Sequence, residues 1–234
     1  MGVPSLNIGF GGENEGGEYH SIYDSYDHYS KYKDPGFAYG VALAQTAGRA
    51  ALRISEADAL PFDFTALHKT VKGYITELMM NVEQMREKAK VENELVNTKA
   101  YVVAADPTEG LQLPTAVAEV PYLDFAPILN ALTQLEKAAQ NVEQLKSTAD
   151  AQKLAAINAK IYTAEQSLLM TTGLPRRPWY KHSLYAPGFY TGYGVKTIPG
   201  VREAIEQKNW AETTAQIAEV AAAINRLANY LETL

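Results

Sequence analysis

The sequence predicts an all-α protein whose helices pack as a helical bundle. Apolar residues recur at helical spacing in several long segments, which is the pattern of helices that bury one face. Alanine-rich flanks such as AEVAAAINRLA allow neighbouring helices to approach closely. Aspartates also stand where several of these segments begin, and aspartate is a preferred residue at a helix N-terminus.

Composition excludes several classes of function. The chain has 234 residues, a formal net charge of −6 and no cysteine. This acidity argues against binding of nucleic acid, and the lack of cysteine excludes disulfides and thiolate metal sites. The longest apolar stretches are shorter than the roughly 20 residues that cross a bilayer. Pro4, Asn7 and several glycines interrupt the apolar region that a signal peptide would need. We therefore expect a soluble chain without membrane contact.

The first segment, VPSLNIGF at residues 3–10, favours one short strand. The exposed loop GFGGENEGGE follows it, with glycines and acids that favour solvent. A single strand is not stable without a partner. We therefore expect residues 3–10 to be the edge of a larger sheet whose other strands lie upstream of this chain.

Two helices are expected next. Asp34-Pro35 predicts the start of the first, which runs to about Ser55, because aspartate caps a helix and proline suits its first turn. The second begins at Asp63 and ends near Val96. Its apolar face consists of Leu67, Val71, Tyr74, Leu78 and Met85.

The remaining helices follow a long connection at residues 97–121, which holds three prolines. Asp124 can cap the third helix, and Ser147-Thr148 separates it from the fourth. A further helix ends the chain. The apolar faces are Ile128, Leu132, Leu135 and Val142 in the third helix, Leu154, Ile157, Ile161, Ala164 and Leu168 in the fourth, and Ile217, Val220, Ile224, Leu227, Leu231 and Leu234 in the last.

Residues 171–200, TTGLPRRPWYKHSLYAPGFYTGYGVKTIPG, are rich in proline, glycine and aromatic residues. This composition predicts an irregular but ordered loop, and long ordered loops often carry function. Arginine and large aromatic side chains are typical anchors of protein interfaces. The interface candidates are Arg176, Arg177, Trp179 and Tyr180.

His20 is the first metal-binding candidate. Asp24 and Asp27 follow at i+4 and i+7, so a helix would place all three on one face, where they can bind a divalent ion. The alternative is a histidine hydrogen-bonded within a tyrosine-rich surface. The other histidines, His28, His68 and His182, have no partner pattern, and GxSxG, Walker and HExxH motifs are absent. The residues alone therefore indicate a helical interaction domain without a complete active site.

The motifs YHSIYDSYDHY, DPGF, LPFD and GLPRRPWYKHSLYAPG resemble the C-terminal part of the glutamate carboxypeptidase II and transferrin receptor family. That family comprises M28-type binuclear zinc peptidases and their non-catalytic relatives. The likeness runs from about Tyr19 to the C-terminus. The block PRRPWYKHSLYAP followed by IPG is its most specific part.

The resemblance implies that residues 1–57 are the tail of an α/β zinc peptidase domain and that residues 58–234 are a helical dimerisation domain. The implied partners are a second copy, the upstream peptidase domain and a peptide substrate. We expect the apolar stripe of the last helix and the aromatic loop to form the pairing surface, because both need a partner to bury them. Members of the family often work outside the cytoplasm, so an extracytoplasmic location is expected.

By the same resemblance, His20 is the last zinc ligand in chain order and Tyr19 hydrogen-bonds to the tetrahedral oxyanion. The other ligands and the glutamate base belong to upstream sequence, so the chain alone is expected to be inactive. Relatives that prefer a C-terminal glutamate bind its carboxylates with a lysine-tyrosine pair, and the matching residues here are Gly192 and Tyr193. Tyr193 fits, Gly192 departs from the pattern and Lys196 is displaced, so strict glutamate specificity is not expected.

Two other functions stay open. A non-catalytic, receptor-like protein would lack zinc ligands or paired glutamates upstream, although His20 weighs against it. In a free-standing helical scaffold, residues 1–57 would be a genuine N-terminal region. Limited proteolysis near residues 11–18 tests this last alternative.

Overall fold

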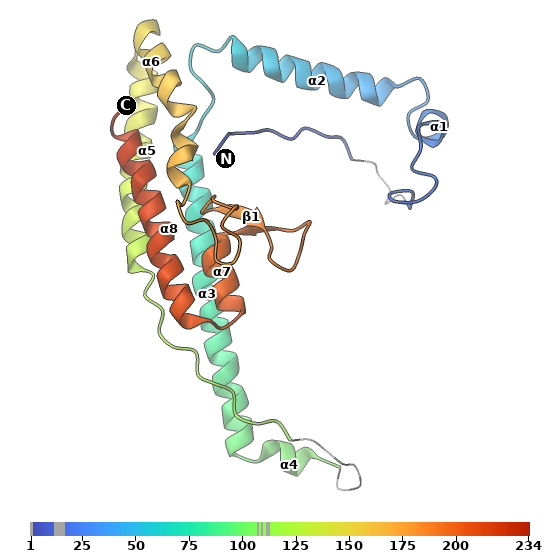
Figure 1. Cartoon of the computed structure of the whole chain (residues 1–234), viewed down its shortest axis with the longest axis vertical. Coiled ribbons are helices and arrows are strands. Elements are labelled where there is room, and N and C mark those ends of the chain that lie inside the picture. The colour runs from blue at the N-terminus through green and yellow to red at the C-terminus, as the bar shows by residue number, and fades with distance from the viewer. Residues whose placement is uncertain (1, 12–16, 107, 109, 111–112) are drawn as a thin grey trace.

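The computed structural model describes residues 2–11, 17–106, 108, 110 and 113–234. It confirms the all-α prediction, with long helices packed along one axis (Figure 1). In chain order the elements are α1 (Tyr26–His28), the π-helical turn η1 (Tyr29–Lys33), α2 (Ala38–Ser55), α3 (Phe64–Asn97), α4 (Ala100–Ala104), α5 (Ala126–Thr148), α6 (Ala151–Ile161), the 3-10 turn η2 (Ala164–Leu168), β1 (Tyr185–Pro187), β2 (Val195–Thr197), α7 (Pro199–Glu206) and α8 (Trp210–Leu231).

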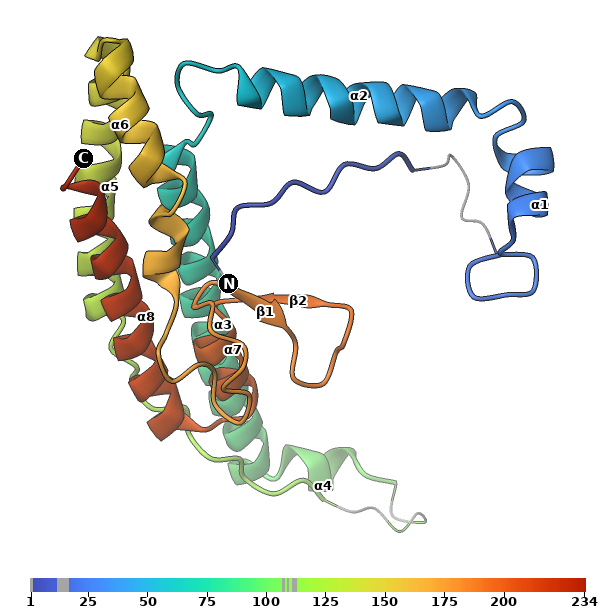
Figure 2. The same cartoon turned by 45° about the horizontal axis from the view of Figure 1, so that its top comes forward.

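Three long helices form the bundle. Helix α5 packs against both α8 and α3, and the three lie side by side in Figures 1 and 2. At 34 residues, α3 is about 50 Å long and extends well past α5 and α8. Asp63 caps it as predicted, because the carboxylate accepts a 2.9 Å hydrogen bond from the Ala66 amide.

The apolar stripe of α8 is buried within this chain. Ile224 is 1% exposed and Leu227 1%, and α5, α7 and η2 all pack on the helix. The expectation that the stripe needs a second protomer to bury it is therefore wrong, because helices of the same chain already cover it. The other buried members are Ile217, Val220 and Leu231, whereas Leu234 lies beyond the helix and is partly buried.

The N-terminal part is arranged differently. Residues 3–10 are extended but form no strand, so the predicted strand is wrong for this chain: no neighbouring strand is present among the described residues to supply ladder hydrogen bonds. Helix α2 has no buried residue and stands away from the bundle (Figure 2).

The N-cap predicted at Asp34 is wrong, because α2 begins four residues later at Ala38 and has Phe37 as its N-cap. Asp34 nevertheless binds amides of the first turn of α2. Its two carboxylate oxygens accept from the amides of Tyr39 and Gly40 at 3.0 and 2.8 Å. Burial raises the pKa of Asp34, but these hydrogen bonds and one from the Tyr29 hydroxyl outweigh it and hold the pKa below the usual range.

Smaller departures come from short elements. The connection at 97–121 contains the short helix α4, and the predicted fourth helix stops at Ile161, with Ala164 and Leu168 in the 3-10 turn η2. The expected irregular loop at 171–200 contains the antiparallel pair β1–β2 and the start of α7. Within the part of the chain that the structure describes, no helix is long and apolar enough to cross a membrane.

Candidate functional site

The candidate site is the segment between η2 and α8, which folds as a tight turn, a hairpin and the short helix α7. The turn depends on Gly173, whose φ of +67° lies in the left-handed region. A Cβ built there would stand 2.2 Å from the Pro178 carbonyl oxygen, so only glycine fits. The Leu174 amide then bonds to the Tyr180 carbonyl at 2.8 Å, which returns the chain to the hairpin.

The hairpin presents the tip loop, which we define as residues 188–194. Tyr185 pairs with Thr197 and Pro187 with Val195 across the two strands. The Gly188 amide donates to the Gly194 carbonyl at 2.9 Å, so the loop is closed at its base by backbone hydrogen bonds.

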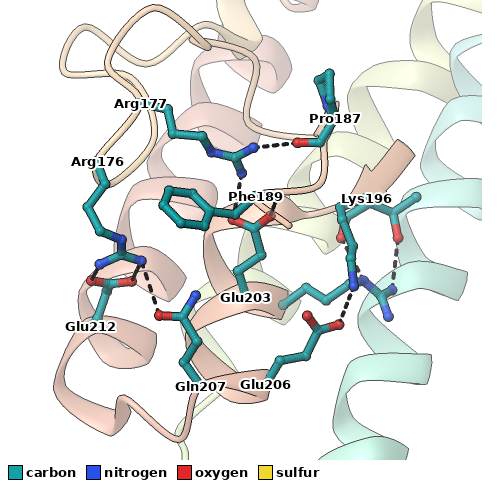
Figure 3. Close-up of polar contacts among 11 residues, drawn as sticks. Arg176, Arg177, Pro187, Phe189, Lys196, Glu203, Glu206, Gln207 and Glu212 are labelled. Carbon is teal, nitrogen blue, oxygen red and sulfur yellow. Dashed lines mark hydrogen bonds and ion pairs between the residues drawn. The ribbon is translucent and has the colours of Figure 1, made fainter. Parts of the chain in front are cut away.

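A buried ion pair fixes the base of the tip loop (Figure 3). Arg177 is 5% exposed and Glu203, on α7, is 6% exposed. Their closest atoms, Nη2 of Arg177 and Oε2 of Glu203, are 2.5 Å apart. Arg177 also donates to the Pro187 carbonyl, and the other oxygen of Glu203 accepts from the Phe189 amide at 2.8 Å. One carboxylate thus holds both the arginine and the start of the loop.

A second ion pair ties the turn to α8. Arg176 donates to the two oxygens of Glu212 at 2.7 and 2.8 Å, which is the bidentate geometry of strong arginine–carboxylate pairs. These hydrogen bonds raise the pKa of Arg176 above its usual range. The guanidinium carbons of Arg176 and Arg177 lie 5.6 and 5.5 Å from the centre of the Phe189 ring, within the range of cation–π attraction.

The four interface candidates therefore differ in availability. Arg177 is buried and Arg176 is engaged by Glu212, whereas Trp179 is 69% exposed and Tyr180 is half-buried against Met170 and its neighbours. On the tip loop, Tyr190 is 81% exposed and Tyr193 is 93% exposed. The surface available to a ligand or partner is thus aromatic.

Lys196 lies on β2 and is not directed to the tip. Its Nζ donates to Glu206 of α7 at 2.6 Å, as Figure 3 shows. Gly192 supplies no side chain. The tip loop consequently presents the hydroxyl of Tyr193 without a neighbouring lysine.

Tyr19 and His20 lie in the N-terminal part, ahead of α1. Both are exposed, and their ring centres are 3.9 Å apart. His20 has a φ of +62° in a turn, so the helical face that would join it to Asp24 and Asp27 is not formed. No group of three histidine, aspartate or glutamate ligands occurs among the described residues. Those residues do not make a metal site by themselves.

The sequence also left one polar cluster unrecognised. His182 is held by Glu165, with Nε2 and Oε1 3.1 Å apart, while its Nδ1 accepts from the Leu184 amide at 3.2 Å. The His182 ring stacks on Tyr185, whose ring meets Tyr74 edge-on. Burial, followed by the nearby Tyr74 and Glu165, raises the pKa of Tyr185 to about 12. No spacing rule links residues from η2, β1 and α3, so only the fold reveals this cluster.

At high pH the protein is expected to lose stability, and Tyr185→Phe should reduce that loss in the free energy of unfolding. The ordinary tyrosine pKa is 10.0 and the folded value is about 12, so the stabilisation is complete below pH 10 and is lost as the pH rises through 12. Urea unfolding of both proteins on either side of this window checks it. The difference in free energy of unfolding between wild type and variant should shrink at high pH.

Comparison with known proteins agrees with this architecture. Residues 123–232 match the model of the transferrin receptor-like dimerisation domain, a range that includes α5, α8 and the whole candidate site. Residues 123–232 form a transferrin receptor-like dimerisation domain.

Full-length relatives extend the likeness beyond the dimerisation domain. A protein of Arabidopsis thaliana named "Probable glutamate carboxypeptidase" is 28% identical over 96% of this chain. One of Arthroderma benhamiae with the same description is 29% identical over 95%, and an aminopeptidase of Rattus norvegicus is 22% identical over 92%. Because each match covers more than 90% of this chain, the likeness includes residues ahead of residue 123. The chain spans 28%, 27% and 26% of the lengths of these relatives.

Proposed function

We propose that this chain pairs two protomers of a zinc-dependent exopeptidase of the M28 type and that its tip loop forms part of the substrate pocket. The observation that carries the proposal is the contrast within the candidate site. The buried Arg177–Glu203 ion pair fixes the base of the loop, whereas Tyr190 and Tyr193 are left exposed at its tip. Rigid support beneath exposed aromatic side chains is the arrangement expected of a recognition loop.

The division into two parts is a component of this proposal. Residues 1–57 would belong to the peptidase domain, and residues 58–234 would form the dimerisation domain. The absence of any buried residue in α2 supports the division, because an 18-residue helix that is not buried by the described part of this chain has a face to bury against other residues.

Most of the zinc ligands would come from residues outside this chain. In the longer protein, His20 would supply one ligand and Tyr19 would hydrogen-bond to the substrate, while the remaining ligands and the general base come from upstream. When bound, zinc supplies Lewis-acid activation of the scissile carbonyl and of water. The described residues of this chain do not hold the ion alone.

The proposed substrate is a peptide whose C-terminal part meets the tip loop. Tyr193 offers a hydroxyl donor, whereas Gly192 offers no charge and Lys196 is engaged by Glu206. A substrate with a C-terminal glutamate would then gain a hydrogen bond but no ion pair at this position, so a broad preference follows.

In the longer protein, Tyr193→Phe is expected to raise KM for peptides about tenfold, because one hydrogen bond to a charged group is lost. Tyr190→Phe is the matched control on the same loop and should leave KM unchanged. Steady-state kinetics on both variants checks this. Equal KM values for both variants would contradict the proposal that Tyr193 contacts the substrate.

Pairing is tested by the mass of this chain in solution. Sedimentation over a wide range of concentration should show a dimer that persists at low concentration, as expected for an interface of roughly 2,000 Å². A monomer at every concentration would contradict pairing by this chain. Because the α8 stripe is already buried, the pairing surface must come from exposed residues elsewhere.

A further inference from the structure

A small pocket lies where the start of α3, the end of α6, η2, β1 and α8 converge. Its volume is about 210 Å³. The floor is apolar, and its members are almost wholly buried: Phe64, Ile161, Leu168, Leu184 and Leu227 are between 0 and 4% exposed. Phe62 and Leu67 form the half-buried rim. Five separate elements contribute, so the pocket is a property of the folded bundle.

Contacts around the pocket keep it open. The His182–Glu165 hydrogen bond joins the residues before β1 to η2. The Tyr185 ring is held edge-on by Tyr74 of α3, with 6.3 Å between ring centres. Because both walls are fixed by directed contacts, the apolar side chains between them do not collapse into the space.

The carboxylates in the pocket lining favour a cation. The lining contains the carboxylates of Glu165 and Asp63 and no lysine or arginine. His182 accepts from the Leu184 amide through Nδ1, which places the proton of the neutral ring on Nε2, facing Glu165. Lys146 is not part of the lining and is bound to the Phe62 carbonyl and to Glu143. Negative charge is therefore left at the mouth of an apolar space.

We propose that this pocket binds a small hydrophobic ammonium ion, with its apolar body against Phe64, Leu168 and Leu227 and its ammonium group at Glu165. The size agrees: an apolar protein cavity of about 150 Å³ holds benzene, so the present space takes a phenyl ring with a short alkylamine. Apolar walls with a few convergent polar groups are typical of small-molecule sites. The site is separate from the tip loop and does not depend on the proposed peptidase role.

The test is an amide NMR titration of the full 234-residue chain with 2-phenylethylamine. Saturable shifts are expected at Leu168, Leu184 and Leu227. 2-Phenylethanol has the same ring and tether without the charge, and should bind about tenfold more weakly. The absence of shifts with the amine, or equal affinities for amine and alcohol, would overturn the proposal.

Variants locate the two halves of the site. Glu165→Gln should weaken the amine about tenfold and leave the alcohol unchanged, whereas Glu219→Gln, the same change at an exposed position of α8 outside the lining, should alter neither. Leu67→Trp fills the half-buried mouth and should abolish binding of both compounds, with circular dichroism to verify the fold. An unchanged amine affinity in either Glu165→Gln or Leu67→Trp would show that the amine binds elsewhere and would sink the proposal.

Discussion

Glu203→Ala is expected to lower the free energy of unfolding by about 3–5 kcal/mol. The substitution leaves the Arg177 guanidinium buried at 5% exposure without its carboxylate, and it removes the acceptor of the Phe189 amide. An unpaired charge in a buried site costs far more than the pair contributes when intact. Urea unfolding followed by circular dichroism measures the loss.

Glu206→Ala is the matched control for Glu203. It lies one turn along α7 and also pairs with a base, Lys196, but its side chain is 48% exposed. Exposed ion pairs contribute at most about 1 kcal/mol, so this variant should remain close to wild type. Similar losses for the two variants would show that the Arg177–Glu203 pair behaves like a surface pair. The double variant Arg177→Met, Glu203→Leu should recover much of the stability, because it removes both charges together.

Ile224→Ala is expected to cost about 2–5 kcal/mol, through lost apolar burial and the cavity that remains. Ile224 is 1% exposed on the face of α8 that belongs to the core. Chemical unfolding measures this cost. The chain should keep its state of association under native conditions, since the stripe is buried within one protomer.

Leu129→Ala on α5 is the comparison for this effect. Leu129 is 40% exposed, so its truncation should cost well under 1 kcal/mol. Sedimentation of both variants separates folding from pairing. If the Ile224→Ala dimer dissociates while its monomer stays fully stable, the apolar stripe of α8 would be part of the dimer interface after all.

Local sequence signals were sufficient for the long helices. The apolar spacing of α3, α5 and α8 and the capping aspartate at Asp63 are properties of neighbouring residues, so they could be read without the fold. The strand predicted at residues 3–10 failed for the opposite reason. Strand propensity is local, but a ladder needs a partner strand, and the two strands of the described residues, β1 and β2, pair with each other instead.

The candidate site depended on contacts between distant residues. The composition of residues 171–200 indicated this segment as a candidate, and the choice of Tyr193 came from the resemblance. Arg177 and Glu203 lie 26 positions apart and Glu165 and His182 lie 17 apart, so no helical or strand period relates them. Arg177 was expected at an interface because arginine is frequent there, but here the same side chain supports the loop from within.

The structure of the tip loop also affects which positions of this protein can change during evolution. Its base depends on Glu203 and Arg177, whereas positions 190, 192 and 193 are exposed. Mutations at these three positions alter the chemistry that the loop presents and leave the scaffold intact. Lineages can thus change the side chains of this loop without first acquiring compensating changes in the core. A combinatorial library restricted to these positions would explore that diversity in a uniformly folded set of proteins.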